Sequence, residues 1–154
     1  SNLALAVNPK LTYVKLKDQK TGEIWILGEN RISFVYAGQK QPEYEILETF
    51  PGHTLSGLSY EPLFPYFADH HKSFRLLSAD YVSQEDGTGI VHLAPAYGED
   101  DFYVCRKEGI SLVDPIDETG CFSEKIFGSV ILFPKDIGII RKPAFGISIE
   151  NEFR

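Results

Sequence analysis

Glycine and proline interrupt this chain so often that it favours many short elements over a few long ones. The 154 residues include 13 glycines and nine prolines. Proline lacks a backbone donor and disrupts helix interiors, and both residues are typical of turns. A helical bundle is therefore disfavoured. A single domain with one substantial core and many turns is the expected organisation.

Alternation of apolar and polar residues predicts strands through much of the chain. Residues 12–17 alternate, and a turn at 18–23 leads into a returning strand at 24–27, which makes a hairpin. The segment 31–36 fits either a short helix or another strand. Further strands are expected at residues 3–7, 44–50, 74–79 and 89–93.

The best helix prediction covers residues 101–108. Its acidic start lies at the positive end of the helix dipole, Arg106 and Lys107 lie near the other end, and Gly109 suits the position after the last turn. The residues alone therefore predict a mainly β architecture with one or two helices. Its strands would form a distorted barrel or a strongly curved sheet.

Two further segments connect these elements. Residues 52–67 form a loop-rich stretch whose prolines exclude a regular helix and whose aromatic side chains must pack onto a core. Beyond Asp114-Pro115 we expect short strands, with a turn at residues 117–120.

The charge and the cysteines restrict partners and compartment. A net charge of −7 argues against broad binding to a nucleic-acid backbone, although one strand end needs only a pocket. The two cysteines, Cys105 and Cys121, lack both a Cys-x-x-Cys spacing and the density of a disulfide framework, so a reducing, cytosolic setting is expected. No apolar run approaches the length of a membrane span.

One stretch, DGTGIVHLAPAYGEDD at residues 86–101, carries most of the candidate chemistry. A glycine-rich turn leads into an apolar strand that contains His92, and a loop leads from there to three consecutive acids at 99–101. Alternation places His92 on the same strand face as Ile90. This arrangement allows His92 and Asp101 to approach each other across the loop.

A purely structural interpretation explains part of this stretch. One of the three acids caps the helix, His92 is a satisfied strand-end histidine, and Gly87-Thr88-Gly89 is a turn. A cap needs only one acid, however, and three adjacent negative charges repel one another unless they hold a cation. On the residues alone, the helix cap and the cation holder both stay open.

Other residue clusters in the sequence lack a catalytic spacing. The adjacent His70 and His71 face opposite ways in an extended segment, so no metal site is expected there. The sequence contains neither a Gly-x-Ser-x-Gly elbow nor a P-loop. Cys105 falls on the predicted helix beside Phe102, which is typical of a small core residue.

The run Gly87-Thr88-Gly89-Ile90-Val91-His92, followed by Ala94-Pro95, Gly98 and Asp101, fits the pattern GTGxVHxAPxxGxxD. This pattern resembles the signature of the editing domains of isoleucyl-tRNA synthetases. The related leucyl and valyl enzymes resemble the GTG and the final aspartate, but they differ where this chain has His92-Leu93-Ala94.

The resemblance extends over about residues 1–126, whereas residues 127–154 fit the family poorly. It includes SNLALAVNP at the start of the chain, FPGHTLSGLSYEPLFPYF at 50–67 and ADYVS at 79–83. It implies that residues 1–154 are a single α+β editing domain with a β-barrel-like core and a few helices. Such a domain, called connective polypeptide 1, is an insertion in a larger synthetase.

The resemblance also implies an activity, the hydrolysis of valine wrongly esterified to the isoleucine tRNA. The physical need is known for this family: one missing methylene gives the synthetic site only about 150-fold discrimination. The attacking water is assisted by the free hydroxyl of the terminal ribose. Editing is expected to need no metal or other cofactor, and ATP and Mg²⁺ belong to the synthetic site of the parent enzyme, outside this chain.

By resemblance, Asp101 anchors the α-ammonium group of the substrate, and its position at a helix start favours the charged carboxylate. His92 is implied to be the size filter that keeps isoleucine from a productive pose. The other expected substrate-binding residues are Thr88, Gly89, Ala94 and Pro95.

The implied partners are the 3′ end of a mischarged tRNA(Ile) and the rest of the synthetase, for a cytoplasmic monomer without membrane contact. The threonine-rich peptide of the family is expected just before Ser1, so we expect weak or undetectable deacylation by this chain alone. Two alternatives stay open. One is the editing domain of a valyl or leucyl enzyme, and the other is a non-catalytic, β-rich binding module.

Overall fold

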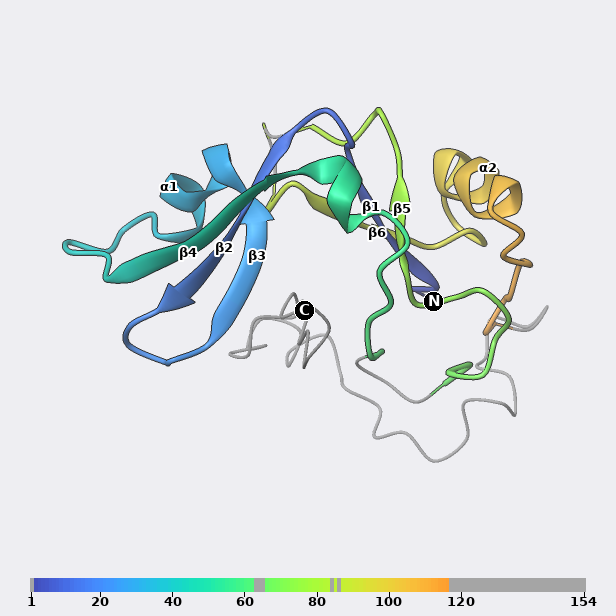
Figure 1. The fold of residues 1–154 in the computed structure, drawn as a ribbon. Coiled ribbons are helices and arrows are strands. Elements are labelled where there is room, and N and C mark those ends of the chain that lie inside the picture. Colours follow the sequence, from blue (N-terminus) through green and yellow to red (C-terminus); the bar gives the residue numbers. More distant parts are fainter. Residues whose placement is uncertain (1, 63–65, 84, 86, 117–154) are drawn as a thin grey trace.

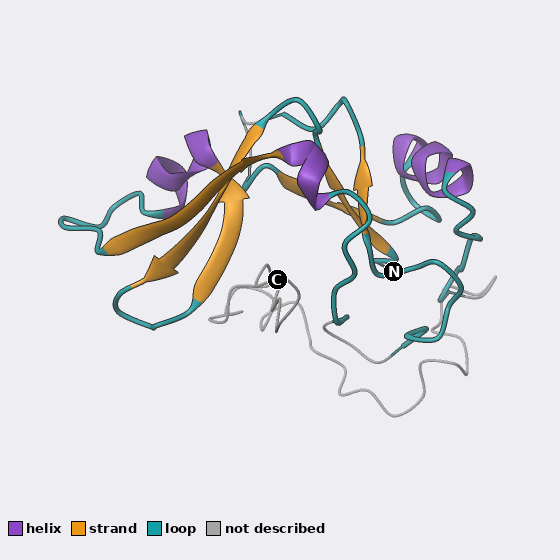
Figure 2. Ribbon diagram, in the orientation of Figure 1, coloured by secondary structure: helices purple, strands orange, loops and turns teal. Residues whose placement is uncertain are grey.

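The structure is a computed structural model, and it describes residues 2–62, 66–83, 85 and 87–116. Strands outweigh helices, and the helices are short (Figure 2). The elements are β1 (Ala4–Val7), β2 (Thr12–Asp18), β3 (Ile24–Gly28), the 3₁₀ helix η1 (Glu29–Arg31), α1 (Ile32–Val35), β4 (Tyr44–Pro51), the 3₁₀ helix η2 (Gly52–Leu55), β5 (Leu76–Ser78), β6 (Ile90–Leu93) and α2 (Glu99–Lys107).

The strands of the described residues form two three-stranded sheets. The first has the order β5-β1-β6, with β1 parallel to β5 and antiparallel to β6. The second has the order β3-β2-β4 and is antiparallel throughout. Figure 1 shows α1 beside the second sheet and α2 at the opposite side of the molecule. The predicted α+β class is confirmed, whereas closure into a barrel stays a prediction.

Strand β1 is the centre of the first sheet and is buried along its whole length. Its alternation sends Ala4 and Ala6 into the core cluster that packs beneath α2. Leu5 and Val7 point into a second cluster, which also contains Tyr13 of β2. Both faces of β1 are therefore covered, which explains its uninterrupted apolar sequence. The second cluster joins the two sheets.

Most of the expected strands are present with slightly different ends. The predicted hairpin is β2 and β3, and the segment 31–36 is helical rather than extended. The strand expected at 74–79 is shorter, because Phe74 has a φ of 56° and this left-handed conformation cannot continue a strand.

Helix α2 begins at Glu99, two residues before the predicted start. It stops as predicted: Gly109 has a φ of 75°, and its N–H donates to the carbonyl of Arg106. The turn expected at 117–120, the strands expected after it and the poorly matched segment 127–154 lie outside the described residues.

Candidate functional site

Strand β6 lies between the two halves of the candidate site, with the GTG turn (residues 87–89) before it and the loop of residues 94–98 after it. Its register places Ile90 and His92 opposite Val7 and Leu5. The two residues therefore share a strand face, as alternation predicted. Ile90 is buried and His92 is exposed.

The GTG turn needs glycine at both of its ends. Gly87 has a φ of 59° and Gly89 a φ of 79°, a region that residues with a side chain rarely adopt. Thr88 between them is half-buried, and its hydroxyl lies 3.4 Å from the carbonyl oxygen of Ile90. The two glycines thus turn the chain sharply into β6.

All three carbonyls of the GTG turn accept hydrogen bonds from β2, β3 or η1. The carbonyl of Gly87 accepts from Arg31 Nε, that of Thr88 from the N–H of Gly28 and that of Gly89 from the hydroxyl of Tyr13, each at 2.8 Å. Arg31 and Tyr13 are both buried. Burial raises the pKa of Tyr13, so this hydroxyl stays a donor at neutral pH. No sequence motif pointed to these two residues.

Asp101 lies at the other end of β6 and holds the 94–98 loop. The N–H of Ala94 donates to Asp101 Oδ2 at 2.9 Å. Gly98 passes so close that a Cβ there would lie 2.8 Å from the same oxygen. The loop therefore folds around the carboxylate, and Ala94, the first residue after β6, is in direct contact with it.

The first turn of α2 holds all three acids, yet a side-chain cap is absent from its start. The N-cap residue is Gly98, which has no side chain to bond the first amides. The helix-cap interpretation, one of the two that the residues alone left open, therefore does not apply to the start of this helix. Asp101 bonds the loop instead, while Glu99 and Asp100 are exposed, where the helix dipole favours their charge.

Tyr81 is a second partner of Asp101 that the sequence did not reveal. Its hydroxyl lies 3.4 Å from Asp101 Oδ1, and its side chain is exposed. Burial of its hydroxyl end and the negative charge of Asp101 raise the pKa of Tyr81, so it remains protonated at neutral pH. The two carboxylate oxygens of Asp101 thus have different donors.

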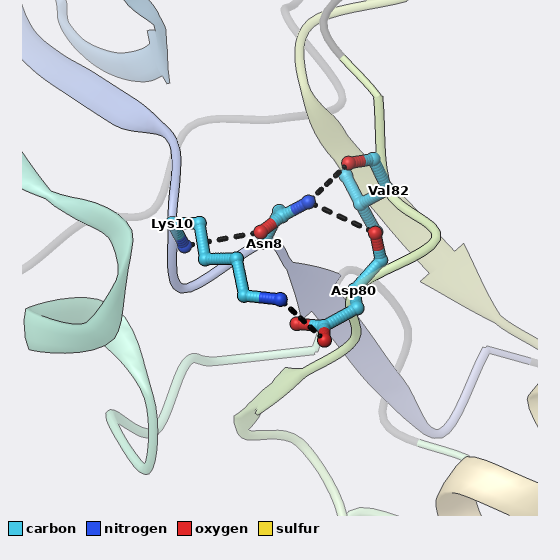
Figure 3. A network of polar contacts seen from close by, with 4 residues as sticks. All are labelled: Asn8, Lys10, Asp80 and Val82. Carbon is cyan, nitrogen blue, oxygen red and sulfur yellow. Dashed lines mark hydrogen bonds and ion pairs between the residues drawn. The ribbon is translucent and has the colours of Figure 1, made fainter.

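A buried asparagine fixes the backbone on both sides of Tyr81 (Figure 3). Asn8 Nδ2 donates to the carbonyls of Asp80 and Val82 at 3.0 and 2.9 Å, and Asn8 Oδ1 accepts the N–H of Lys10. The Lys10–Asp80 ion pair beside it is largely solvent-exposed and adds little to stability. The position of Tyr81 is therefore set from the end of β1.

His92 carries a perturbed imidazole. Partial burial of its ring lowers the pKa of His92 below its ordinary value, although much of the residue is accessible to solvent. The neutral ring is therefore favoured at pH 7.

The adjacent histidines, for which no metal site was predicted, lie elsewhere. His70 and His71 line an open pocket of about 480 Å³ together with Phe67, Asp69, Ser111 and Val113. The lining contains none of the predicted site residues. Within the part of the chain that the structure describes, three or more His, Cys, Asp or Glu side chains do not gather into a possible metal site. The metal and cofactor expectations stay predictions.

Cys105 is a core residue, as predicted. It is fully buried in the cluster beneath α2, and burial, with a contribution from the charge of Asp101, raises the pKa of the Cys105 thiol to about 11. A thiol with such a pKa is a poor nucleophile at neutral pH. Cys121 lies outside the described residues. None of the described helices has the length and apolar character that a membrane span needs.

The sequences most similar to this chain include isoleucine–tRNA ligases. The enzyme from Chlamydia trachomatis serovar D is 42% identical over 146 residues, which cover 92% of this chain and 14% of that protein. The probable cytoplasmic isoleucine–tRNA ligase of Dictyostelium discoideum is 44% identical over 88% of this chain. The Bdellovibrio bacteriovorus enzyme is 45% identical over 82% of it.

The chain belongs to the isoleucine–tRNA ligase family. It spans only about one seventh of the length of these curated relatives, 12–14% in the three compared. No family profile matches the chain.

The fold agrees with that of a solved structure. A solved structure described as "The crystal structure of GlLeuRS-CP1" matches with a TM-score of 0.55 over 75% of this chain and 50% of the other. At 21% identity this likeness concerns the fold alone. The family resemblance and the predicted fold class are thus confirmed, and the roles of the site residues stay predictions.

Proposed function

We propose that this chain is the editing domain of an isoleucyl-tRNA synthetase and that it hydrolyses valine esterified to tRNA(Ile). The observation that carries the proposal is Asp101. In a chain of this family, its carboxylate is held against the end of β6 with one oxygen bonded to a backbone amide. The 14% share of the relatives' length is that of one inserted domain rather than of a whole ligase.

Asp101 supplies the binding chemistry of the proposed reaction. An aminoacyl ester carries a free α-ammonium group, and a charge-assisted bond to a carboxylate is its natural partner. Oδ2 already accepts the Ala94 amide at 2.9 Å, whereas Oδ1 has only the long Tyr81 contact among the described residues. Since a carboxylate oxygen accepts about two hydrogen bonds, Oδ1 is the oxygen that receives the ammonium.

His92 and the residues around β6 shape the rest of the site. His92 excludes the additional methylene of isoleucine, and Thr88, Gly89, Ala94 and Pro95 line the path of the aminoacyl-adenosine. Water attacks the ester carbonyl with help from the free ribose hydroxyl of the substrate. The protein then holds and orients the ester, which agrees with the buried state of Cys105.

The proposal also places the chain among its partners. It acts on the 3′ end of mischarged tRNA(Ile), as a monomeric unit that works with the rest of the synthetase. ATP and Mg²⁺ serve the synthetic site of that enzyme and take no part in editing. A cytoplasmic location fits the word "cytoplasmic" in the name of the Dictyostelium relative.

Titration of the chain with a non-hydrolysable valyl-adenosine analogue tests the proposal. Asp101→Ala should weaken binding roughly 100-fold, because a hydrogen-bonded charge pair is worth about 1.5–3 kcal/mol and its loss leaves the ammonium without a counterion. Asp100→Ala is the matched control: it removes the same charge from the same helix turn but at an exposed side chain. Equal affinities of the two variants would rule out the anchor role.

The same titration separates the alternative functions. Threonyl- and norvalyl-adenosine analogues represent valyl- and leucyl-type editing, and the identity to isoleucine–tRNA ligases predicts that the valyl analogue binds best. A non-catalytic binding module would bind none of the three. The likeness to GlLeuRS-CP1 does not favour leucyl-type editing, because it concerns the fold alone.

A further inference from the structure

The two oxygens of the Asp101 carboxylate are held by groups from different parts of the chain. The Ala94 amide that bonds Oδ2 belongs to the GTGxVHxAPxxGxxD stretch itself. The Tyr81 hydroxyl beside Oδ1 comes from the turn that follows β5, in a segment that precedes this stretch. The orientation of the carboxylate therefore depends on a residue outside the signature.

The backbone that carries Tyr81 is rigidly placed. Asn8, with 8% of its surface exposed, bonds the carbonyls on both sides of Tyr81. The N–H of Ala79 donates to the carbonyl of Val7 at 2.9 Å, and Val82 is buried in the core cluster beneath α2. A side chain on so constrained a segment has a defined position although it is exposed.

The position of the Tyr81 ring matters more than the strength of its hydrogen bond. At 3.4 Å the hydroxyl contact is long and individually weak. The side chain is 44% exposed, yet its hydroxyl lies beside Oδ1 while the Ala94 amide bonds Oδ2, so the two contacts together restrict rotation of the carboxylate. A carboxylate with a fixed orientation attracts a cation more strongly than a freely rotating one, because less freedom is lost on binding.

We propose that Tyr81 is a positioning residue of the ammonium site: its hydroxyl and the Ala94 amide together orient Asp101 so that Oδ1 faces the α-ammonium of the aminoacyl ester. This inference rests on the proposed function, since it deepens the anchor role of Asp101. Tyr81 thereby contributes to the preference for a substrate with a free amino group over one without it.

The chain offers a matched control in a second tyrosine–aspartate pair. Tyr97 is exposed to a similar extent, and its hydroxyl donates to Asp114 Oδ1 at 2.9 Å. Tyr97 lies in the 94–98 loop and is therefore near the site, but its partner is a different carboxylate. Tyr97→Phe removes a shorter hydrogen bond than Tyr81→Phe does without touching Asp101.

The experiment compares two ligands in the 154-residue chain, the non-hydrolysable valyl-adenosine analogue and its counterpart with a hydroxyl in place of the ammonium. The ratio of their dissociation constants does not depend on the fraction of folded protein. Tyr81→Phe should reduce the ammonium preference about threefold, the order expected for one weak hydrogen bond to a charged group. Tyr81→Ala should reduce it about tenfold, and Tyr97→Phe should leave it unchanged.

The outcomes distinguish failure of the proposed function from failure of this inference alone. A wild-type chain that binds neither ligand, or that has no ammonium preference, would overturn the proposed function and this inference with it. If the wild-type preference is abolished by Asp101→Ala but unaffected by both Tyr81 variants, the anchor stands and the role of Tyr81 is wrong. An equal reduction of the ammonium preference in Tyr97→Phe would also contradict the positioning role of Tyr81.

Discussion

The two ends of β6 are held in different ways. At the GTG end, three carbonyls are bonded at 2.8 Å, two of them by the buried side chains of Arg31 and Tyr13. At the other end, Asp101 is half-buried. Its second donor is the hydroxyl of Tyr81, an exposed side chain, at the longer distance of 3.4 Å. One end is fixed to the neighbouring sheet, and the other presents a carboxylate to solvent.

This difference suggests a division of roles along one short strand. Buried hydrogen bonds are costly to break because water cannot replace the lost partner, so the GTG end sets the position of β6. The Asp101 end retains acceptor capacity for a ligand because its bonds leave one oxygen only weakly engaged. Substitutions at the first end should therefore change stability, and substitutions at the second should change binding.

The largest expected effect is the loss of stability in Tyr13→Phe. The Tyr13 hydroxyl accepts the N–H of Asn8 at 3.0 Å and donates to the carbonyl of Gly89 at 2.8 Å, and all of these contacts are buried. Removal of the hydroxyl leaves two buried backbone groups unpaired at about 1–3 kcal/mol each, so the free energy of unfolding should fall by roughly 2–6 kcal/mol. Urea denaturation of the wild-type and Tyr13→Phe chains measures this difference in the free energy of unfolding.

Tyr97→Phe is the control for this measurement, because it removes an exposed hydroxyl and should change stability by less than about 0.5 kcal/mol. If the two variants were equally stable, the GTG end would not be the fixed end, and the contrast between the two ends of β6 would disappear.

A smaller effect is expected from His92→Ala, on selectivity rather than on stability. The side chain is exposed, so its loss removes little packing. As the proposed size filter, it accounts for part of the discrimination against one methylene, a difference of about 1–3 kcal/mol in such pockets. The ratio of affinities for valyl- and isoleucyl-adenosine analogues should therefore fall about tenfold. Val91→Ala, at the exposed neighbouring position, should leave this ratio unchanged.

If the His92→Ala chain kept the wild-type affinity ratio, another residue would have to be the size filter. If Asp101→Ala still weakened binding of the valyl analogue in that case, the Asp101 end of β6 would remain the proposed binding end.

The elements were predictable from the sequence wherever local patterns decide them. Periodicity and glycine predict the hairpin of β2 and β3, the face shared by Ile90 and His92, and the end of α2 just before Gly109. The left-handed Phe74 was not predictable, because nothing in its own chemistry favours a positive φ; tertiary contacts impose it.

The contacts of the candidate site were predictable only in the part that a local motif contains. Asp101 and His92 belong to one continuous stretch, so their spacing could be recognised. Arg31 and Tyr81 contact that stretch from positions 56 residues before Gly87 and 20 residues before Asp101. Such contacts form because the two sheets and the Asn8 hydrogen bonds bring segments together that are far apart in the sequence. No local sequence pattern predicts that proximity.

The smallest expected effect is a pH dependence that originates at the binding end of β6. Burial lowers the pKa of His92 from 6.5, so the unfolded chain binds the proton more readily than the folded one. Above about pH 6.5 the imidazole is neutral in both states and has no effect. As the pH falls below that value, stability is lost progressively until the folded-state pKa is passed. The GTG end has no matching response, since the raised pKa of Tyr13 keeps its hydroxyl protonated throughout. The thermal unfolding midpoint of the wild-type chain should therefore decrease between pH 7.5 and pH 5.5, and the decrease should be smaller in His92→Gln. Midpoints that fall in parallel for the two chains would show that His92 has the same pKa in the folded and unfolded states.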